Sequence, residues 1–153
     1  EKIAKKHYFL DEEWAKNVYE KSKKSYEKDG KKFPYKDNMD IGKTIQSWNC
    51  DFLCEGPVIS IVLQGPHAIE IVRKMVGSTE PKSALPGTIR GDFISIESYA
   101  VSDANKRVMR NLVHASDSVE SATREIALWF SPNELNPNYK TATEMILYEK
   151  SQF

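Results

Sequence analysis

A short apolar run between two Gly-Pro pairs limits the folds open to this chain. Gly56-Pro57 precedes the run Val58–Leu63, and Gly65-Pro66 follows it. The run is rich in β-branched residues and has the length of a strand, so it predicts a buried β-strand. A strand of this kind must pair with others, which favours a layered fold that contains a sheet.

A second strand is predicted over Phe93–Val101. Ile94 and Ile96 alternate there with polar residues, and the alternation changes phase near Ser98, where we expect a break or bulge. A polar turn, residues 102–107, follows this segment.

Helical patterns surround both predicted strands. Apolar residues three or four apart mark each of them, and an acidic start marks the first. The predicted helices run from Asp11 to near Gly30, from Ile41 to Leu53, over 67–76 before Gly77, and from behind the capping cluster Ser116-Asp117-Ser118 to Ser131-Pro132. Residues 31–38 read as a loop. Helices that alternate with strands indicate an α/β or α+β fold.

Length and charge fit one globular domain. The chain has 153 residues, with 22 basic and 22 acidic side chains, so its charge gives no case for nucleic acid or an anionic membrane as a partner. Residues 1–43 nevertheless hold twelve lysines and no arginine. We interpret Lys21–Lys28 as a solvated helix face, with a binding role as the alternative.

The two cysteines do not form a recognisable metal motif. Cys50 and Cys54 are four residues apart, with no second Cys/His pair to complete a zinc site, so we expect reduced thiols. The N-terminal residues are charged and no apolar stretch follows them, which does not fit a signal peptide. No apolar run has the length of a membrane span.

His114 is the first candidate for chemistry. It follows the apolar pair Leu112-Val113 and precedes a predicted helix start, where backbone N–H groups favour an anion. A neutral imidazole is a competent nucleophile near pH 7 and can carry a phosphoryl group. By position alone, a structural or merely exposed histidine is the more common interpretation.

The stretch Ser78–Asp92 is the second candidate. It has no periodicity, contains Thr79, and places Arg90 between two glycines. Long aperiodic loops are often functional, and the guanidinium groups of Arg73 and Arg90 suit phosphate oxygens. The alternative, that the glycines make turns and the arginines pair with acids, stays open. Neither a Walker A loop nor a dinucleotide Gly-x-Gly-x-x-Gly motif occurs.

Five sequence motifs, taken together, resemble the nucleoside diphosphate kinase family from about residue 56 to Leu135. They are Gly56-Pro57-Val58, Leu63-Gln64-Gly65-Pro66, Pro86-Gly87-Thr88-Ile89-Arg90-Gly91-Asp92-Phe93, Asn111-Leu112-Val113-His114-Ala115-Ser116-Asp117-Ser118 and Glu125-Ile126-Ala127-Leu128-Trp129-Phe130. The Asn-x-x-His-x-Ser-Asp-Ser string is specific to that family. Lys6-His7-Tyr8 resembles the family more weakly. Ala115 departs from the family pattern, which has glycine after the histidine.

The resemblance implies an enzyme that moves the terminal phosphate of ATP to nucleoside diphosphates by a ping-pong mechanism. It implies that His114 is the phosphorylated nucleophile, that Glu125 orients the imidazole, and that Ser116 supports Glu125 and the transferred group. The implied nucleotide contacts are Tyr8, Arg73, Thr79 and Arg90 for the phosphates and Asn111 for the sugar. Mg²⁺ is expected to arrive on the nucleotide phosphates, with Asp117 near it at most through water and no direct protein ligand.

The implied fold is α+β, a ferredoxin-like antiparallel sheet with helices on its faces. We expect residues 1–153 to form a single nucleoside diphosphate kinase-like domain that is incomplete at its N-terminus, because the family's first strand with its Lys-Pro-Asp-Gly motif does not occur here. Either the sequence is partial or another polypeptide supplies the missing strands. Residues 10–45 are expected to form a lysine-rich helical insertion. Residues 96–108 are expected to be another insertion, and both should lie at the surface.

The resemblance also bears on partners and location. It implies a homo-oligomer, a hexamer or tetramer, in the cytoplasm, without a membrane or specific nucleic acid as partner. Two other interpretations remain: a catalytically impaired nucleotide-binding or regulatory relative, and a scaffold built on the lysine-rich helix.

Overall fold

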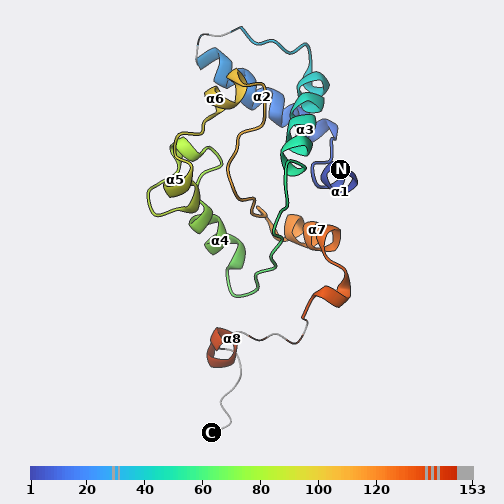
Figure 1. Cartoon of the computed structure of the whole chain (residues 1–153), viewed down its shortest axis with the longest axis vertical. Coiled ribbons are helices and arrows are strands. Elements are labelled where there is room, and N and C mark those ends of the chain that lie inside the picture. The colour runs from blue at the N-terminus through green and yellow to red at the C-terminus, as the bar shows by residue number, and fades with distance from the viewer. Residues whose placement is uncertain (29, 31, 137, 139, 141, 148–153) are drawn as a thin grey trace. The chain divides into compact units, whose positions relative to one another are not determined.

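A computed structural model describes residues 1–28, 30, 32–136, 138, 140 and 142–147 of the chain (Figure 1). Its regular elements are α1 (Lys2–His7), α2 (Glu12–Lys28), α3 (Asn38–Leu53), α4 (Ala68–Val76), the 3₁₀ turn η1 (Pro81–Ser83), α5 (Ile89–Phe93), α6 (Tyr99–Ala104), α7 (Val119–Trp129), the 3₁₀ turn η2 (Pro132–Glu134) and α8 (Ala142–Leu147). No helix within the described residues combines the length and apolar character needed to cross a membrane.

The chain divides into two compact units. Unit 1 consists of Glu1–Val58 and Ser102–Val108, and unit 2 consists of Ile59–Val101 and Met109–Phe153. The two units are described separately below.

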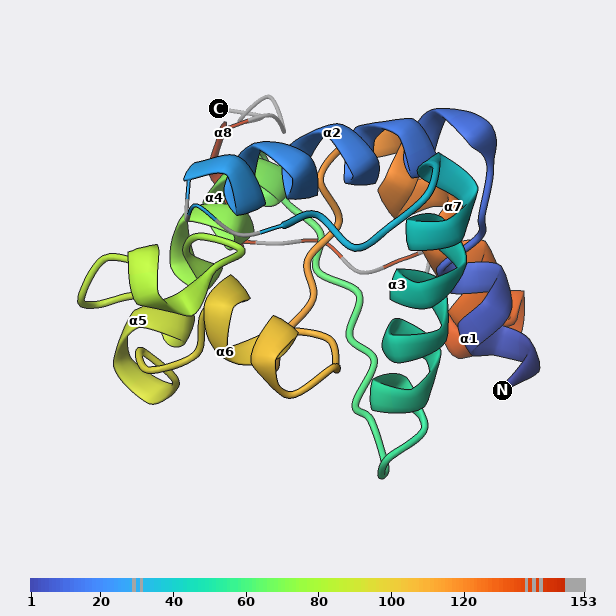
Figure 2. The same ribbon diagram turned by 90° about the horizontal axis from the view of Figure 1, so that it is seen from above.

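Unit 1 is built on α3, against which α1 and α2 pack (Figure 2). Its core includes Ala15 and Ile41, which are almost fully buried. Gly42 permits the close approach, because a Cβ there would lie 3.0 Å from the Cβ of Ala15. Asp11 accepts a hydrogen bond from the Trp14 backbone N–H at 2.7 Å, and Asp37 caps α3 in the same way. The two predicted N-terminal helices are confirmed, although α3 begins three residues earlier than expected.

An aromatic cluster packs the loop that follows α2 against that helix. The ring of Phe33 lies edge-on to Tyr19, Tyr26 and Tyr35, at centroid distances of 5.1, 5.5 and 5.4 Å. Tyr26 also forms a hydrogen bond with the carboxylate of Asp103, from the returning segment of unit 1. Burial, and then the negative charge of Asp103, raise the pKa of Tyr26 to about 12. The same two causes raise the pKa of Tyr35.

The lysine-rich face of α2 is solvated, as predicted. Lys21, Lys23 and Lys24 are exposed, and the Lys23 ammonium lies 5.9 Å from the centre of the Tyr19 ring. The side chain of Lys28 lies outside the described residues. Both cysteines are free thiols, with Cys50 buried and Cys54 exposed.

The sequence predicted a strand at Val58–Leu63, and this prediction is wrong, because these described residues form no strand. The segment has no regular secondary structure, and Ile59, Ile61 and Leu63 expose 89%, 70% and 61% of their surface. A strand exists only when a neighbour pairs with its N–H and C=O groups. The apolar residues favour the interior of a sheet, but no other described segment pairs with Val58–Leu63.

The predicted strand at Phe93–Val101 is also wrong. Phe93 is the last residue of α5, and α6 begins at Tyr99. Between them the Glu97 backbone N–H donates to the Ile94 carbonyl at 3.0 Å, which closes a turn and leaves Ile96 87% exposed. Local hydrogen bonds therefore override the alternation of polar and apolar residues. The stretch 78–92 is likewise more regular than expected, because it contains η1 and most of α5.

In unit 2, α4 and α7 lie where the sequence predicted helices. α4 ends at Gly77, whose φ of 87° suits glycine, and α5 packs against α4 (Figure 1). Ser118 caps α7, since its side chain accepts a hydrogen bond from the Ser121 N–H at 3.1 Å. α1, α6 and α8 were not predicted.

Replacing Tyr26 with phenylalanine should change the alkaline unfolding of the protein. In the unfolded chain this phenol ionises near pH 10, and in the folded chain at about 12. The contribution of the neutral phenol to the free energy of unfolding is therefore complete below pH 10 and is lost as the pH rises through 12. We expect Tyr26→Phe to lose the tyrosinate absorbance step near pH 12 and to flatten the decline in stability above pH 10. An unchanged absorbance titration would contradict the assignment.

Replacing Gly77 with alanine should destabilise unit 2. The φ of 87° and ψ of −175° at Gly77 form a backbone conformation that costs other residues about 1–3 kcal/mol, and a Cβ would lie 2.5 Å from the Thr88 hydroxyl oxygen. Gly56→Ala is the matched control, because nothing lies within 4 Å of a Cβ there. Urea denaturation should show a loss of free energy of unfolding for Gly77→Ala that clearly exceeds the loss for Gly56→Ala.

Candidate active site

His114 lies in an irregular segment of unit 2 that leads into α7. The Val113 N–H donates to the Asn111 carbonyl at 2.7 Å, and Leu112 between them has a φ of 63°. This three-residue turn with a positive φ at a leucine is a strained backbone conformation. The nucleophile predicted from the sequence thus follows a strained turn by one residue.

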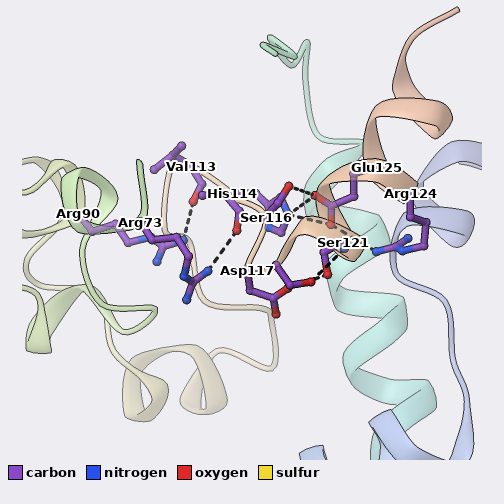
Figure 3. Close-up of polar contacts among 11 residues, drawn as sticks. Arg73, Arg90, Val113, His114, Ser116, Asp117, Ser121, Arg124 and Glu125 are labelled. Atoms are coloured by element: carbon purple, nitrogen blue, oxygen red, sulfur yellow. Dashed lines mark hydrogen bonds and ion pairs between the residues drawn. The ribbon is translucent and has the colours of Figure 1, made fainter. Parts of the chain in front are cut away.

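The imidazole of His114 contacts a carboxylate from the middle of α7. Its Nε2 lies 3.2 and 3.1 Å from the two carboxylate oxygens of Glu125 (Figure 3). The Ser116 hydroxyl donates to the same carboxylate at 2.6 Å, and the Arg124 guanidinium lies 3.3 Å from it. The side chain of Glu125 is 12% exposed, whereas that of His114 is 51% exposed. The ring is therefore held from the protein side and open to solvent.

This contact selects one tautomer of His114. A carboxylate can only accept, so Nε2 carries the proton that it donates to Glu125. In the neutral ring, Nδ1 then bears the lone pair that can act as a nucleophile. The arrangement of nucleophile, orienting carboxylate and supporting hydroxyl is typical of covalent catalysis.

Two arginines approach the His114 segment from the side opposite Glu125 (Figure 3). Arg73, exposed on α4, donates from Nη1 to the Ala115 carbonyl at 3.3 Å. Arg90, on α5, is only 7% exposed and donates from Nη2 to the Val113 carbonyl at 2.7 Å. Burial and the charge of Arg73 lower the pKa of Arg90, which still leaves a guanidinium charged at neutral pH. Two guanidinium groups therefore lie on this side of the His114 segment.

Asp117 adds a carboxylate next to the segment. The Ser121 hydroxyl donates to it at 2.7 Å, and this hydrogen bond, ahead of its own backbone N–H and the charges of Arg73 and His114, lowers the pKa of Asp117. The group is exposed and stays ionised at neutral pH. An exposed carboxylate is a suitable neighbour for a hydrated Mg²⁺ ion.

The other residues predicted from the sequence are less tightly placed. Thr79 is exposed in the turn after α4, and Asn111 is half-buried. Tyr8 belongs to unit 1, where its carbonyl accepts a hydrogen bond from the Gln46 amide at 2.7 Å, and its position relative to His114 is not defined.

Sequence reasoning missed two supporting residues, Ser121 and Arg124. The spacing of Asp117 and Ser121, four apart at a helix start, was a usable signal for their hydrogen bond. The carbonyls of Gly77 and Ser78, which Arg90 contacts, gave no signal, because every residue has a carbonyl.

Known proteins identify the family to which this arrangement belongs. The family model for nucleoside diphosphate kinase matches residues 2–135. A nucleoside diphosphate kinase of Pyrobaculum aerophilum is 42% identical over 132 residues, which cover 84% of this chain and 72% of the relative. One of Pyrococcus furiosus is 37% identical over 150 residues, covering 98% of this chain and 76% of the relative.

Solved structures agree with the sequence matches. The crystal structure of the Pyrobaculum aerophilum enzyme superposes with a TM-score of 0.81 at 40% identity, covering 87% of this chain and 75% of that one. A transition-state mimic of the Borrelia burgdorferi nucleoside diphosphate kinase, with bound vanadate and ADP, superposes with a TM-score of 0.70 at 34% identity, covering 95% and 71%. The resemblance seen in the motifs is confirmed, and this chain belongs to the nucleoside diphosphate kinase family, a family of phosphotransferases.

Proposed function

We propose that the phosphoryl transfer of this family proceeds in this chain through a phosphohistidine at His114. The observation that carries the proposal is the contact of Nε2 with the Glu125 carboxylate at 3.1 Å, which fixes the ring and leaves the lone pair on Nδ1. ATP is the donor, and a nucleoside diphosphate is the acceptor. The net result maintains the pools of nucleoside triphosphates.

The reaction has two half-steps that mirror each other. In the first, Nδ1 attacks the γ-phosphorus of ATP, an N–P bond forms, and the bond from phosphorus to the bridging oxygen breaks, so that ADP leaves with the electron pair. In the second, a terminal phosphate oxygen of another nucleoside diphosphate attacks the same phosphorus, and the electron pair of the N–P bond returns to Nδ1. Throughout, Nε2 keeps its proton, and the Glu125 carboxylate offsets the positive charge that the ring acquires.

Catalysis of this kind depends on position and on charge. The guanidinium groups of Arg73 and Arg90 and the hydroxyl of Thr79 are suited to hold the phosphate oxygens. Contacts of Tyr8 with the phosphates and of Asn111 with the sugar complete the proposed nucleotide site. The vanadate and ADP bound by the Borrelia burgdorferi relative are chemically consistent with this assignment.

Mg²⁺ is proposed to accompany the nucleotide. The ionised and exposed carboxylate of Asp117 fits a water-mediated contact with such an ion, and no direct protein ligand is proposed. When bound, the ion neutralises part of the phosphate charge.

We also propose that the enzyme has an α+β fold in which the exposed apolar segment Val58–Leu63 belongs to a ferredoxin-like antiparallel sheet. The TM-scores against family structures and the exposure of Ile59 and Ile61 support this, because such side chains are normally buried by packing. A single kinase domain over 1–153 that contains the insertion 10–45, assembly into a hexamer or tetramer, and a cytoplasmic location remain proposals that follow from family membership.

The direct test is exposure of the protein to ATP and Mg²⁺. We expect a phosphoryl adduct that acid destroys and base preserves, and that is lost in His114→Asn. His67→Asn is the matched control, because His67 is an exposed histidine of the same unit. It should keep the adduct. An adduct that persists in His114→Asn would reject the site, and wild-type protein without any adduct would favour a nucleotide-binding relative without turnover.

Replacing Glu125 with glutamine should slow formation of the phosphohistidine by about 10²-fold, because the amide has no charge to offset the positive charge that the ring acquires. The amide oxygen can still accept from Nε2, but the negative charge is lost. Glu120→Gln makes the same chemical change on an exposed residue of the same helix. Quenched-flow rates should fall for Glu125→Gln and stay unchanged for Glu120→Gln. Equal rates in the two variants would contradict the orienting role.

A further inference from the structure

The bend that carries Thr79 lies beside the His114 segment. The Arg90 side chain donates to the carbonyl of Ser78 at 3.1 Å and to that of Val113 at 2.7 Å. These two carbonyls immediately precede Thr79 and His114 in the chain. Thr79 itself is exposed and belongs to no helix. A hydroxyl group in such a bend can hold a phosphate oxygen reliably only if other contacts fix the backbone that carries it.

The residue after Thr79 supplies contacts of this kind. One carboxylate oxygen of Glu80 accepts from the Ser83 hydroxyl at 2.7 Å, at the end of η1. The other accepts from the backbone N–H of Tyr99 at 3.1 Å, nineteen residues further along the chain. Tyr99 is the first residue of α6, where a backbone N–H has no partner within the helix. The carboxylate of Glu80 thus joins the bend at Thr79 to a segment that is distant in sequence.

A second contact runs beside the first. The Lys82 N–H donates to the Glu97 carbonyl at 3.0 Å. Pro81, Glu97 and Ser98 are all buried. Residues 97–99 therefore pack against the turn η1, and both belong to unit 2. The sequence predicted an insertion over 96–108, and the start of that segment is joined to the bend at Thr79 by side-chain and backbone hydrogen bonds.

We propose that Glu80 is a positioning residue, which joins the start of segment 96–108 to the bend after α4 and so fixes Thr79 for a phosphate oxygen of the nucleotide. The proposal deepens the role of the same site and rests on the proposed contact of Thr79 with the phosphates. Glu80 itself does not contact the nucleotide, because both of its carboxylate oxygens accept hydrogen bonds from the protein. Segment 96–108 then supports phosphate binding from outside the nucleotide site.

Removal of the Tyr99 N–H tests the proposal from the distant end of the contact. Tyr99→Pro deletes the donor, and proline is tolerated at the first residue of a helix. Tyr99→Ala is the matched control, because it removes the same ring but keeps the N–H. The ring has electrostatic interactions of its own: burial and then the charge of Glu80 raise the pKa of the Tyr99 phenol, and the charge of Arg90 lowers it. Both variants lose these interactions equally.

Two measurements compare these variants. We expect the methyl signal of Thr79, recorded by NMR without nucleotide, to move further in Tyr99→Pro than in Tyr99→Ala. We expect the affinity for ADP with Mg²⁺ to be about threefold to tenfold lower in Tyr99→Pro than in Tyr99→Ala, because a displaced hydroxyl makes a weaker hydrogen bond to a charged phosphate. A Thr79 signal that responds equally to both variants would overturn the proposal.

A double-mutant cycle shows whether the loss of affinity acts through Thr79. Thr79→Val removes the hydroxyl, so Tyr99→Pro and Tyr99→Ala should bind ADP equally in that background. A difference of the same size with and without the hydroxyl would also overturn the proposal. Thr79→Val alone with wild-type affinity for ADP would instead reject the proposed phosphate contact. The Thr79 signal, which needs no nucleotide, distinguishes that failure from a failure of Glu80 to place the residue.

Substitutions of Glu80 give an independent answer if Tyr99→Pro does not fold. Glu80→Ala removes both hydrogen bonds, whereas the amide oxygen of Glu80→Gln can still accept from the Tyr99 N–H. Glu134→Ala is the matched control, because Glu134 accepts from the hydroxyl and the N–H of Ser131 at the 3₁₀ turn η2, both at 2.8 Å. The affinity for ADP should fall in Glu80→Ala, recover largely in Glu80→Gln and stay unchanged in Glu134→Ala. Equal affinities in Glu80→Ala and Glu134→Ala would count against the positioning role.

Discussion

The hydrogen bonds of the buried Arg90 guanidinium support the irregular part of the site. Gly77, Ser78 and Val113 lie outside the helices, and their carbonyls accept hydrogen bonds from the Arg90 side chain. A single planar side chain donates to all three. The end of α4, the start of α5 and the backbone before His114 are consequently held at one point. The orientation of the imidazole by Glu125 is useful only because the backbone beneath it is fixed.

The sequence predicted those elements whose stability is local. α2, α3, α4 and α7 follow from apolar spacing and from caps such as Asp11 and Ser118, each of which acts within one helical turn. The strands predicted at Val58–Leu63 and Phe93–Val101 are absent from the described residues. A strand needs a partner strand, which can be distant in sequence. Alternating polar and apolar side chains indicate a preference for such pairing but do not supply the partner.

In the candidate site too, some contacts could be predicted from the sequence and others could not. The pairing of His114 with Glu125, eleven residues apart, was implied by a family resemblance, and the support of Asp117 by Ser121 was readable from helical spacing. The contacts of Arg90 were not readable. A guanidinium in the sequence suggests a phosphate or a carboxylate as its partner, whereas the partners of Arg90 are carbonyls, which no residue type marks.

The two arginines beside His114 differ in their exposure to solvent, because Arg90 is buried and Arg73 is exposed. If Arg90 turned away, three part-buried hydrogen bonds from a charged donor would be lost. If Arg73 turned, one exposed carbonyl would lose a 3.3 Å hydrogen bond, and water would replace it. Moving the exposed guanidinium of Arg73 therefore costs less than moving the buried guanidinium of Arg90. A site that transfers a phosphoryl group needs positive charge beside its nucleophile, and both guanidinium groups supply such charge next to the His114 segment.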